Sequence, residues 1–141
     1  MSKVLIIEDE IATATPVKSA LELEGISADI ANNGNIGLEM FQKNDYDLIL
    51  LDLKMPGLSG EKVLEEIRKR DPFIDVIIYT NYTDFSDIKK LTNIGIEGYV
   101  NKGPNAELTE LLDMIKSKLA PLDDFVVEKL IDSLPEENTD D

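Results

Sequence analysis

Five short apolar runs, separated by longer segments with apolar residues at helical spacing, constrain the fold of this chain more than any other feature. The runs are residues 4–7, 28–31, 48–51, 76–79 and 98–100. Each is short and rich in aliphatic residues, which is typical of a β-strand that is buried on both faces. The pattern therefore predicts five strands.

The intervening segments carry apolar residues three or four positions apart, as one face of an α-helix does. Examples are Ile36 with Met40 and Val63 with Ile67. Strict alternation of strands and helices requires parallel strands joined by right-handed crossovers. The sequence thus predicts an α/β fold, a doubly wound five-stranded parallel sheet with helices on both faces. Ligands bind such sheets beyond the carboxyl ends of the strands.

Composition narrows the function. A chain of 141 residues suits one domain. The absence of His and Cys excludes a cysteine nucleophile and a Ser-His-Asp triad, and the net charge of −15 disfavours binding to nucleic acid or to anionic membranes. No apolar run approaches the ~18 residues of a membrane span, and the stretch after Met1 is too short for a signal peptide. We therefore expect a cytoplasmic protein.

The acidic charge is concentrated at the end of the chain. Residues 122–141 carry eight acidic side chains and one basic one. We expect a domain over residues 1–121, an amphipathic extra helix over 122–134 and a disordered acidic tail over 135–141. The helix either covers an apolar patch of its own domain or docks on a switching face or on a second copy, which would give a homodimer.

Polar side chains follow four of the predicted strands, where those strands end. Glu8 and Asp9 follow the first, Asp52 the third, Thr80 the fourth and Lys102 the fifth. Carboxylates that meet at one edge repel one another unless a cation neutralises them, and Mg²⁺ prefers such oxygen ligands. The simpler interpretation of the acidic residues after the first strand is a solvated turn that caps a helix.

Asp52 is the strongest candidate for chemistry. It directly follows a buried run and precedes Met55, Pro56 and Gly57, a rigid turn that keeps its carboxylate accessible. A carboxylate that attacks phosphorus forms an acyl phosphate, and the transition state calls for a metal ion and a second cation. Lys102 supplies that cation. Taken singly, each of these residues could be ordinary surface or strand.

In combination, these residues resemble the receiver domains of bacterial two-component response regulators over roughly residues 3–119. The resemblance rests on Glu8, Asp9, Asp52 with the following LKMPG and Gly60, Thr80, Tyr99 and Lys102. It implies the flavodoxin-like strand order 2-1-3-4-5. It also implies transfer of a phosphoryl group from a histidine kinase or a phosphotransfer protein to Asp52, with no enzymatic activity beyond the domain's own phosphorylation and dephosphorylation.

The resemblance assigns a role to each residue. Mg²⁺ would be held by Asp9, Asp52 and the backbone carbonyl of Lys54, with Glu8 acting through water. Lys102 would pair with the phosphoryl group. Thr80 would move towards it and Tyr99 would turn inward, which remodels a face for a downstream protein partner. A half-buried strand aromatic is the alternative interpretation of Tyr99.

Three positions depart from the family pattern. Pro16 lies in the first expected helix, so either the helix opens there after a long acidic loop or it kinks. Gly103 follows Lys102 where the family has proline, and Asn81 follows Thr80 where it has a small residue. The remaining alternative is a receiver-like module that binds partners without phosphorylation. Residues beyond 121 leave no room for an output domain, so we expect a stand-alone receiver or one excised from a longer protein.

Overall fold

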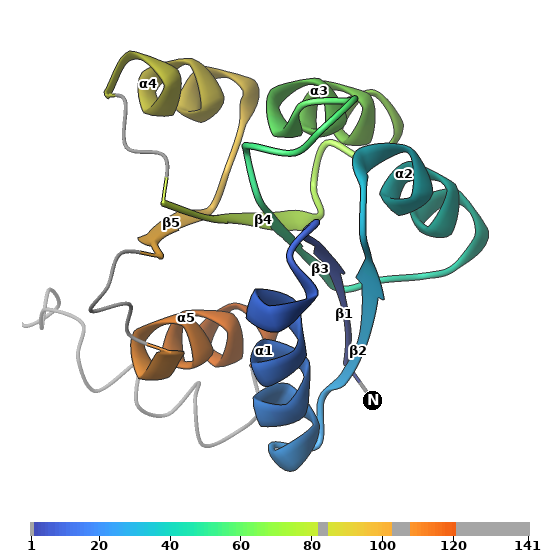
Figure 1. Cartoon of the computed structure of the whole chain (residues 1–141), viewed down its shortest axis with the longest axis vertical. Coiled ribbons are helices and arrows are strands. Elements are labelled where there is room, and N and C mark those ends of the chain that lie inside the picture. Colours follow the sequence, from blue (N-terminus) through green and yellow to red (C-terminus); the bar gives the residue numbers. More distant parts are fainter. Residues whose placement is uncertain (1, 82–84, 103–107, 121–141) are drawn as a thin grey trace, which may run out of the picture.

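The computed structural model describes residues 2–81, 85–102 and 108–120, in which strands and helices alternate (Figure 1). The elements are β1 Lys3–Ile7, α1 Ile11–Leu23, β2 Ser27–Ala31, α2 Gly34–Lys43, β3 Leu48–Leu51, α3 Gly60–Arg70, β4 Asp75–Thr80, α4 Phe85–Ile94, β5 Gly98–Asn101 and α5 Leu108–Leu119. The expected helix over 122–134 and the tail after it lie outside the described residues.

The five strands form one parallel sheet in the order β2-β1-β3-β4-β5, which confirms the predicted fold. Ile7 of β1 is in register with Leu51 of β3, and Thr80 of β4 is in register with Asn101 of β5. The residues that follow these strands therefore reach the same edge of the sheet.

Helices cover both faces of the sheet. Figure 1 shows α1 and α5 on one face and α2, α3 and α4 on the other. Successive strand residues point to opposite faces, so Leu5 and Ile7 pack beneath α2 and α3 while Val4 and Ile6 pack beneath α1 and α5. Fully burying an aliphatic side chain stabilises the fold by roughly 1.5–3 kcal/mol. Burial on both faces explains why the central strands β1, β3 and β4 have nearly continuous apolar sequences.

Helix α1 begins at Ile11, directly after Glu10, and Pro16 lies inside it. Of the two alternatives left open at this position, a long acidic loop with a helix opening at Pro16 is therefore wrong. The physical reason is packing: Ala14 and Val17, on either side of the proline, are buried against the sheet and hold this segment in helical geometry. Their burial offsets the cost of the backbone hydrogen bond that a proline cannot donate.

Arg68 connects the end of α3 to the turns that precede β4 and β5. Its guanidinium donates to Oε1 of Glu97 at 3.0 Å and is only 10% exposed. It also donates to the carbonyl oxygens of Asp71, Ile74 and Gly95. One side chain therefore satisfies four acceptors in two separate turns, residues 71–74 and residues 95–97.

We expect Arg68→Met to lower the free energy of unfolding by about 2–4 kcal/mol, because it removes the donor to three carbonyl groups and the cation paired with the partly buried carboxylate of Glu97. Urea denaturation followed by circular dichroism measures the change. The control is Lys69→Met, which removes the neighbouring exposed cation paired with Glu66 and should have no measurable effect. Equal stability of the two variants would contradict the role assigned to Arg68.

Candidate functional site

The sequence-predicted site residues meet at the carboxyl edge of the sheet. The amide of Asp52 donates to the carbonyl of Ile7 at 3.0 Å, which fixes the end of β3 beside the end of β1. The amide of Lys102 donates to the carbonyl of Thr80 at 2.9 Å, which fixes the end of β5 beside the end of β4. Backbone pairing alone thus gathers residues that lie far apart in the sequence.

Three carboxylates form one cluster. Glu8, Asp9 and Asp52 each offer an oxygen within 4.8 Å of the others. Glu8 is 3% exposed and Asp52 is 5% exposed. Among the described residues, Oδ1 of Asp52 is the buried side-chain oxygen that has no hydrogen-bond partner. Leaving a buried acceptor unsatisfied costs roughly 1–3 kcal/mol. The unsatisfied oxygen and the set of hard oxygen donors both fit a Mg²⁺ ion.

The ammonium group of Lys102 lies against this cluster. Nζ of Lys102 is 2.5 Å from Oε1 of Glu8, 3.4 Å from Oδ2 of Asp52 and 3.9 Å from Oε1 of Glu10. It also lies 5.6 Å from the centre of the Tyr79 ring. One cation therefore faces three buried or rim carboxylates, which leaves the site negative and able to accept a further cation.

Glu8 and Lys102, the acid and the base in closest contact, both have pKa values that are raised above their ordinary values. Burial raises the pKa of Glu8 to about 7; the hydrogen bond from Lys102 opposes this rise and the charge of Asp52 adds to it. Burial works to lower the pKa of Lys102, but the hydrogen bond to Glu8 and the charge of Asp52 outweigh it and raise that pKa. Lys102 is therefore charged at neutral pH.

Thr80 and Tyr99 share one face of the sheet. Tyr99 is in register with Ile78, and Thr80 is two residues beyond Ile78, so all three point towards the layer that contains α3 and α4. Thr80 is fully buried, and Tyr99 packs partly buried against that core. Burial also raises the pKa of the Tyr99 hydroxyl. The two residues proposed to switch together are therefore placed on the same side of the sheet.

The loop after Asp52 is held close to α3. The amide of Gly60 donates to the carbonyl of Leu53 at 3.0 Å. A Cβ atom at residue 60 would overlap the carbonyl oxygen of Asp52 and lie 2.6 Å from Cα of Leu53. Gly57 turns the same loop with a φ of +80°, a conformation that favours glycine. Glycines at both positions allow the loop to present Asp52 from the end of β3.

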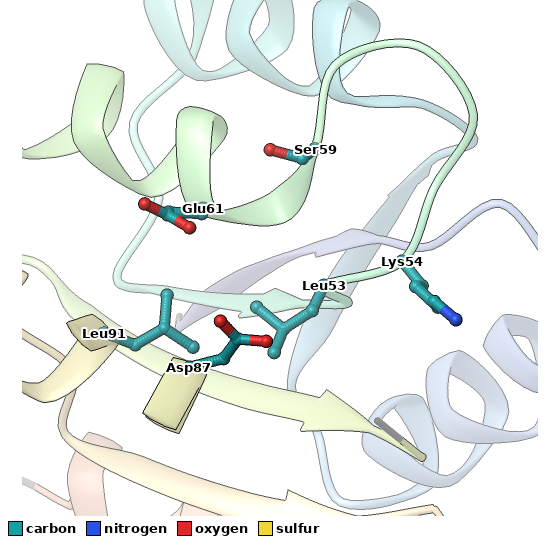
Figure 2. Close-up of a pocket in the computed structure, with 6 residues that line it drawn as sticks. All are labelled: Leu53, Lys54, Ser59, Glu61, Asp87 and Leu91. Atoms are coloured by element: carbon teal, nitrogen blue, oxygen red, sulfur yellow. The ribbon is translucent and has the colours of Figure 1, made fainter. Parts of the chain in front are cut away.

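A hollow of about 220 Å³ lies beside this loop, between the start of α3 and α4 (Figure 2). Leu53 and Leu91 form its apolar part, and Glu61 and Asp87 contribute carboxylates. The side chain of Lys54, which is exposed, extends away from Leu91. A hollow therefore separates this side of α4 from the loop that follows Asp52.

The sequence did not reveal the contacts of Lys102 with Glu8 and Tyr79. Each contact joins residues at the ends of two different strands, and no local spacing in the sequence predicts such a pair. Tyr79 could have been found as the last apolar residue before Thr80, because alternate residues near the end of a central strand border the carboxyl edge. Gly103 and Pro104, where the sequence departs from the family pattern after Lys102, lie outside the described residues.

The model of the response regulator receiver domain matches residues 4–116 of the chain. The chain belongs to the response regulator receiver domain family. The resemblance seen in the sequence is thereby confirmed. No comparison supports the alternative of a receiver-like module that binds partners without phosphorylation.

Curated relatives of this receiver domain include longer proteins. The "uncharacterized transcriptional regulatory protein YkoG" of Bacillus subtilis is 40% identical over 116 residues, which are 82% of this chain and 50% of that protein. The "response regulator ArlR" of Staphylococcus saprophyticus is 37% identical over 84% of this chain and 53% of that protein. The chain thus spans about half the length of the curated relatives it matches.

Solved structures show the same fold. A response regulator receiver domain protein from Methanospirillum hungatei is 30% identical and superimposes with a TM-score of 0.80, covering 84% of this chain and 94% of that one. The response regulator TrrA of Thermotoga maritima, solved in complex with Mg²⁺ and BeF, is 34% identical with a TM-score of 0.75, covering 84% of this chain and all of that one. In the part of the receiver domain that the structure describes, no helix has the length and apolar character needed to cross a membrane.

Proposed function

We propose that this chain relays a signal by accepting a phosphoryl group on Asp52 from the phosphohistidine of a histidine kinase or a phosphotransfer protein. The observation that carries the proposal is the buried carboxylate of Asp52, which has one oxygen without a partner and lies beside Lys102 and two further carboxylates. Family membership supports the same function. Such a protein acts in the cytoplasm and catalyses only its own modification.

The metal site follows from the donors present. Asp9, Asp52 and the backbone carbonyl of Lys54 would hold Mg²⁺, with Glu8 reaching it through a water molecule. The bound ion neutralises negative charge on the carboxylates and on the incoming phosphoryl group. The cluster of three carboxylates and the unsatisfied oxygen of Asp52 support this assignment.

Three side chains of this protein take part in the transfer of the phosphoryl group. A carboxylate oxygen of Asp52 forms a bond to phosphorus while the phosphorus–nitrogen bond of the donor breaks, and the electron pair of that bond returns to the imidazole. Lys102 is already within 3.4 Å of Asp52 and exchanges its contact with Glu8 for one with a phosphoryl oxygen. The hydroxyl of Thr80 donates to another phosphoryl oxygen.

The response spreads from Thr80. Movement of Thr80 towards the phosphoryl group leaves space that Tyr99, on the same side of the sheet, enters. The hollow beside the loop that follows Asp52 gives α4 room to shift at the same time. The face built from α4, β5 and α5 thereby changes shape and binds a downstream protein. Residues 1–121 form the receiver domain that does this.

We expect modification of Asp52 to require a divalent cation, because an anionic nucleophile among carboxylates repels an anionic donor. Incubation with acetyl phosphate and Mg²⁺ should add one phosphoryl group, located on Asp52 by mass spectrometry. Excess chelator should abolish the addition. Mg²⁺ at ten times its Kd should also stabilise the fold by about 1.4 kcal/mol.

Two variants complete this experiment: Asp9→Asn tests the carboxylate cluster, and Glu39→Gln is its matched control. Asp9→Asn removes a member of the cluster and should lose both the labelling and the stabilisation by Mg²⁺. Glu39→Gln neutralises an exposed carboxylate on α2 that pairs with Lys43 and should keep both. Full labelling in excess chelator would contradict the proposed function.

A further inference from the structure

Tyr79 lies on the same side of the sheet as Glu8, Asp52 and Lys102, which together form the acceptor site. Its ring belongs to the core between the sheet and helices α1 and α5. Each residue of the acceptor site follows, by two positions, a strand residue of that same core: Ile6, Leu50 and Val100. Alternate residues of a strand point to the same face. Tyr79 and the acceptor site are therefore neighbours on one face.

The ring of Tyr79 faces the ammonium group of Lys102. Nζ of Lys102 lies over the ring, 5.6 Å from its centre. An aromatic face attracts a cation within about 6 Å of its centre, and the attraction is stronger where water is excluded. Tyr79 is 7% exposed and the side chain of Lys102 is 6% exposed, so little water reaches this contact.

The surroundings of Tyr79 fix the position of its ring. Its backbone is paired in the sheet, where Tyr79 is in register with Val100 of β5. Together with Val17 of α1 and Leu108 of α5, the side chain lines a groove that also borders Lys102. Burial raises the pKa of the Tyr79 hydroxyl, although the charge of Lys102 opposes the rise, so the ring stays neutral at pH 7. A fixed, neutral ring thus lies beneath a flexible, charged side chain.

The other groups close to this ammonium group are anions. In the described part of the chain, three carboxylates lie within 4 Å of Nζ, those of Glu8, Asp52 and Glu10. Asp9 adds a further negative charge to the cluster. Each anion competes with a phosphoryl oxygen for the lysine, whereas a neutral ring attracts the cation without taking its hydrogen bonds. The ring therefore allows Lys102 to leave Glu8 and still remain beside Asp52.

The simpler interpretation of Tyr79 is that it only packs the core. Ile77, two residues earlier in β4, fills the same core with an aliphatic side chain. An aliphatic residue would serve equally well at position 79 if packing were its whole role. The two interpretations therefore differ in what an aliphatic substitution does to the reaction at Asp52.

We propose that Tyr79 is a positioning residue for phosphoryl transfer. Its ring holds the ammonium group of Lys102 beside Asp52 while that group exchanges Glu8 for a phosphoryl oxygen. The inference rests on the proposed function, because it gives the ring a part in the reaction at Asp52. Tyr79 acts through Lys102 and takes no part in the making or breaking of bonds.

Substitution of Tyr79 in the full chain tests the role of the ring. Tyr79→Phe keeps the ring, and acetyl phosphate with Mg²⁺ should label it at the rate of the unaltered chain. Tyr79→Leu keeps an apolar side chain without a ring, and its labelling should be about tenfold slower. The matched control is Tyr46→Leu, because Tyr46 is similarly buried and lies 5.2 Å from the ammonium group of Lys3 at the opposite edge of the sheet. It should lose stability without a change in labelling rate.

Two further measurements separate positioning from packing. In a Lys102→Met chain, which has no ammonium group to position, Tyr79→Leu should cause no additional slowing. Nuclear magnetic resonance of the unmodified chain needs neither labelling nor a folded variant: the ring current of Tyr79 should shift the ε-methylene protons of Lys102. The shift should persist in Tyr79→Phe and disappear in Tyr79→Leu.

The possible failures are distinguishable. Equal labelling rates of Tyr79→Leu and Tyr79→Phe, additional slowing in the Lys102→Met chain, or the absence of a ring-current shift at Lys102 would each overturn this inference alone. Absence of labelling in the unaltered chain would overturn the proposed function and this inference with it.

Discussion

Asp52→Asn should reduce phosphorylation by acetyl phosphate and Mg²⁺ at least ~1,000-fold, because removal of a covalent nucleophile leaves only background reaction. Asparagine has the same shape as aspartate, so the end of β3 and the loop tied to Gly60 should keep their positions. Intact-mass spectrometry over a time course measures the rate. Binding of beryllofluoride, a phosphoryl mimic, should disappear in parallel.

The same substitution should make the fold more stable when Mg²⁺ is absent. It removes one of three clustered carboxylates and replaces an unsatisfied buried oxygen with an amide that can donate. Asp45→Asn, at an exposed position in the turn before β3, is the matched control and should change neither labelling nor stability. Labelling of Asp52→Asn at the rate of the unaltered chain would contradict the role of Asp52.

The fold could be predicted because the central strands β1, β3 and β4 are buried on both faces. Residues 48–51 were expected as a strand and form β3 with those bounds, while β1 and β4 extend the predicted runs by polar or charged end residues such as Lys3 and Asp75. A run of apolar residues does not include a polar residue at the end of a strand, although that residue can still pair within the sheet. The strand order came from the family resemblance, since no local pattern states which strands are neighbours.

The start of α1 shows where local rules fail. Pro16 predicts a helix boundary when its neighbours are considered alone. In the structure, the burial of Ala14 and Val17 against the sheet outweighs that preference, and the helix begins five residues earlier, at Ile11. Tertiary packing therefore decided between two helix boundaries that the sequence pattern left open.

The membership of the site was easier to predict than its contacts. Parallel topology alone requires that Glu8, Asp52 and Lys102 lie at one edge of the sheet. It does not specify which carboxylate holds the lysine in the unmodified protein. The structure gives the shortest contact to Glu8, a residue 94 positions away in the chain, and a longer one to Asp52. In the unmodified protein, the lysine that we propose to bind the phosphoryl group is thus held most closely by Glu8.

Lys102→Met should weaken both the fold and the reaction. Glu8 and Asp52 are almost completely buried, and loss of the ammonium group leaves them without their cation. Breaking such a buried pair typically costs 3–5 kcal/mol, and we expect a decrease of about 3 kcal/mol in the free energy of unfolding, measured with urea in metal-free buffer. Loss of one preorganised charge at the transition state should slow labelling by ~100-fold.

A double variant separates the two effects. Glu8→Gln with Lys102→Met removes both members of the closest ion pair, so it should recover about 1–2 kcal/mol relative to Lys102→Met alone. It should not restore labelling, because no cation remains to pair with the phosphoryl oxygens. Lys89→Met, at an exposed position on α4, controls for the change of charge and should alter neither quantity. A Lys102→Met protein as stable and as rapidly labelled as the Lys89→Met control would show that the ammonium group neither neutralises the carboxylates nor assists the transfer.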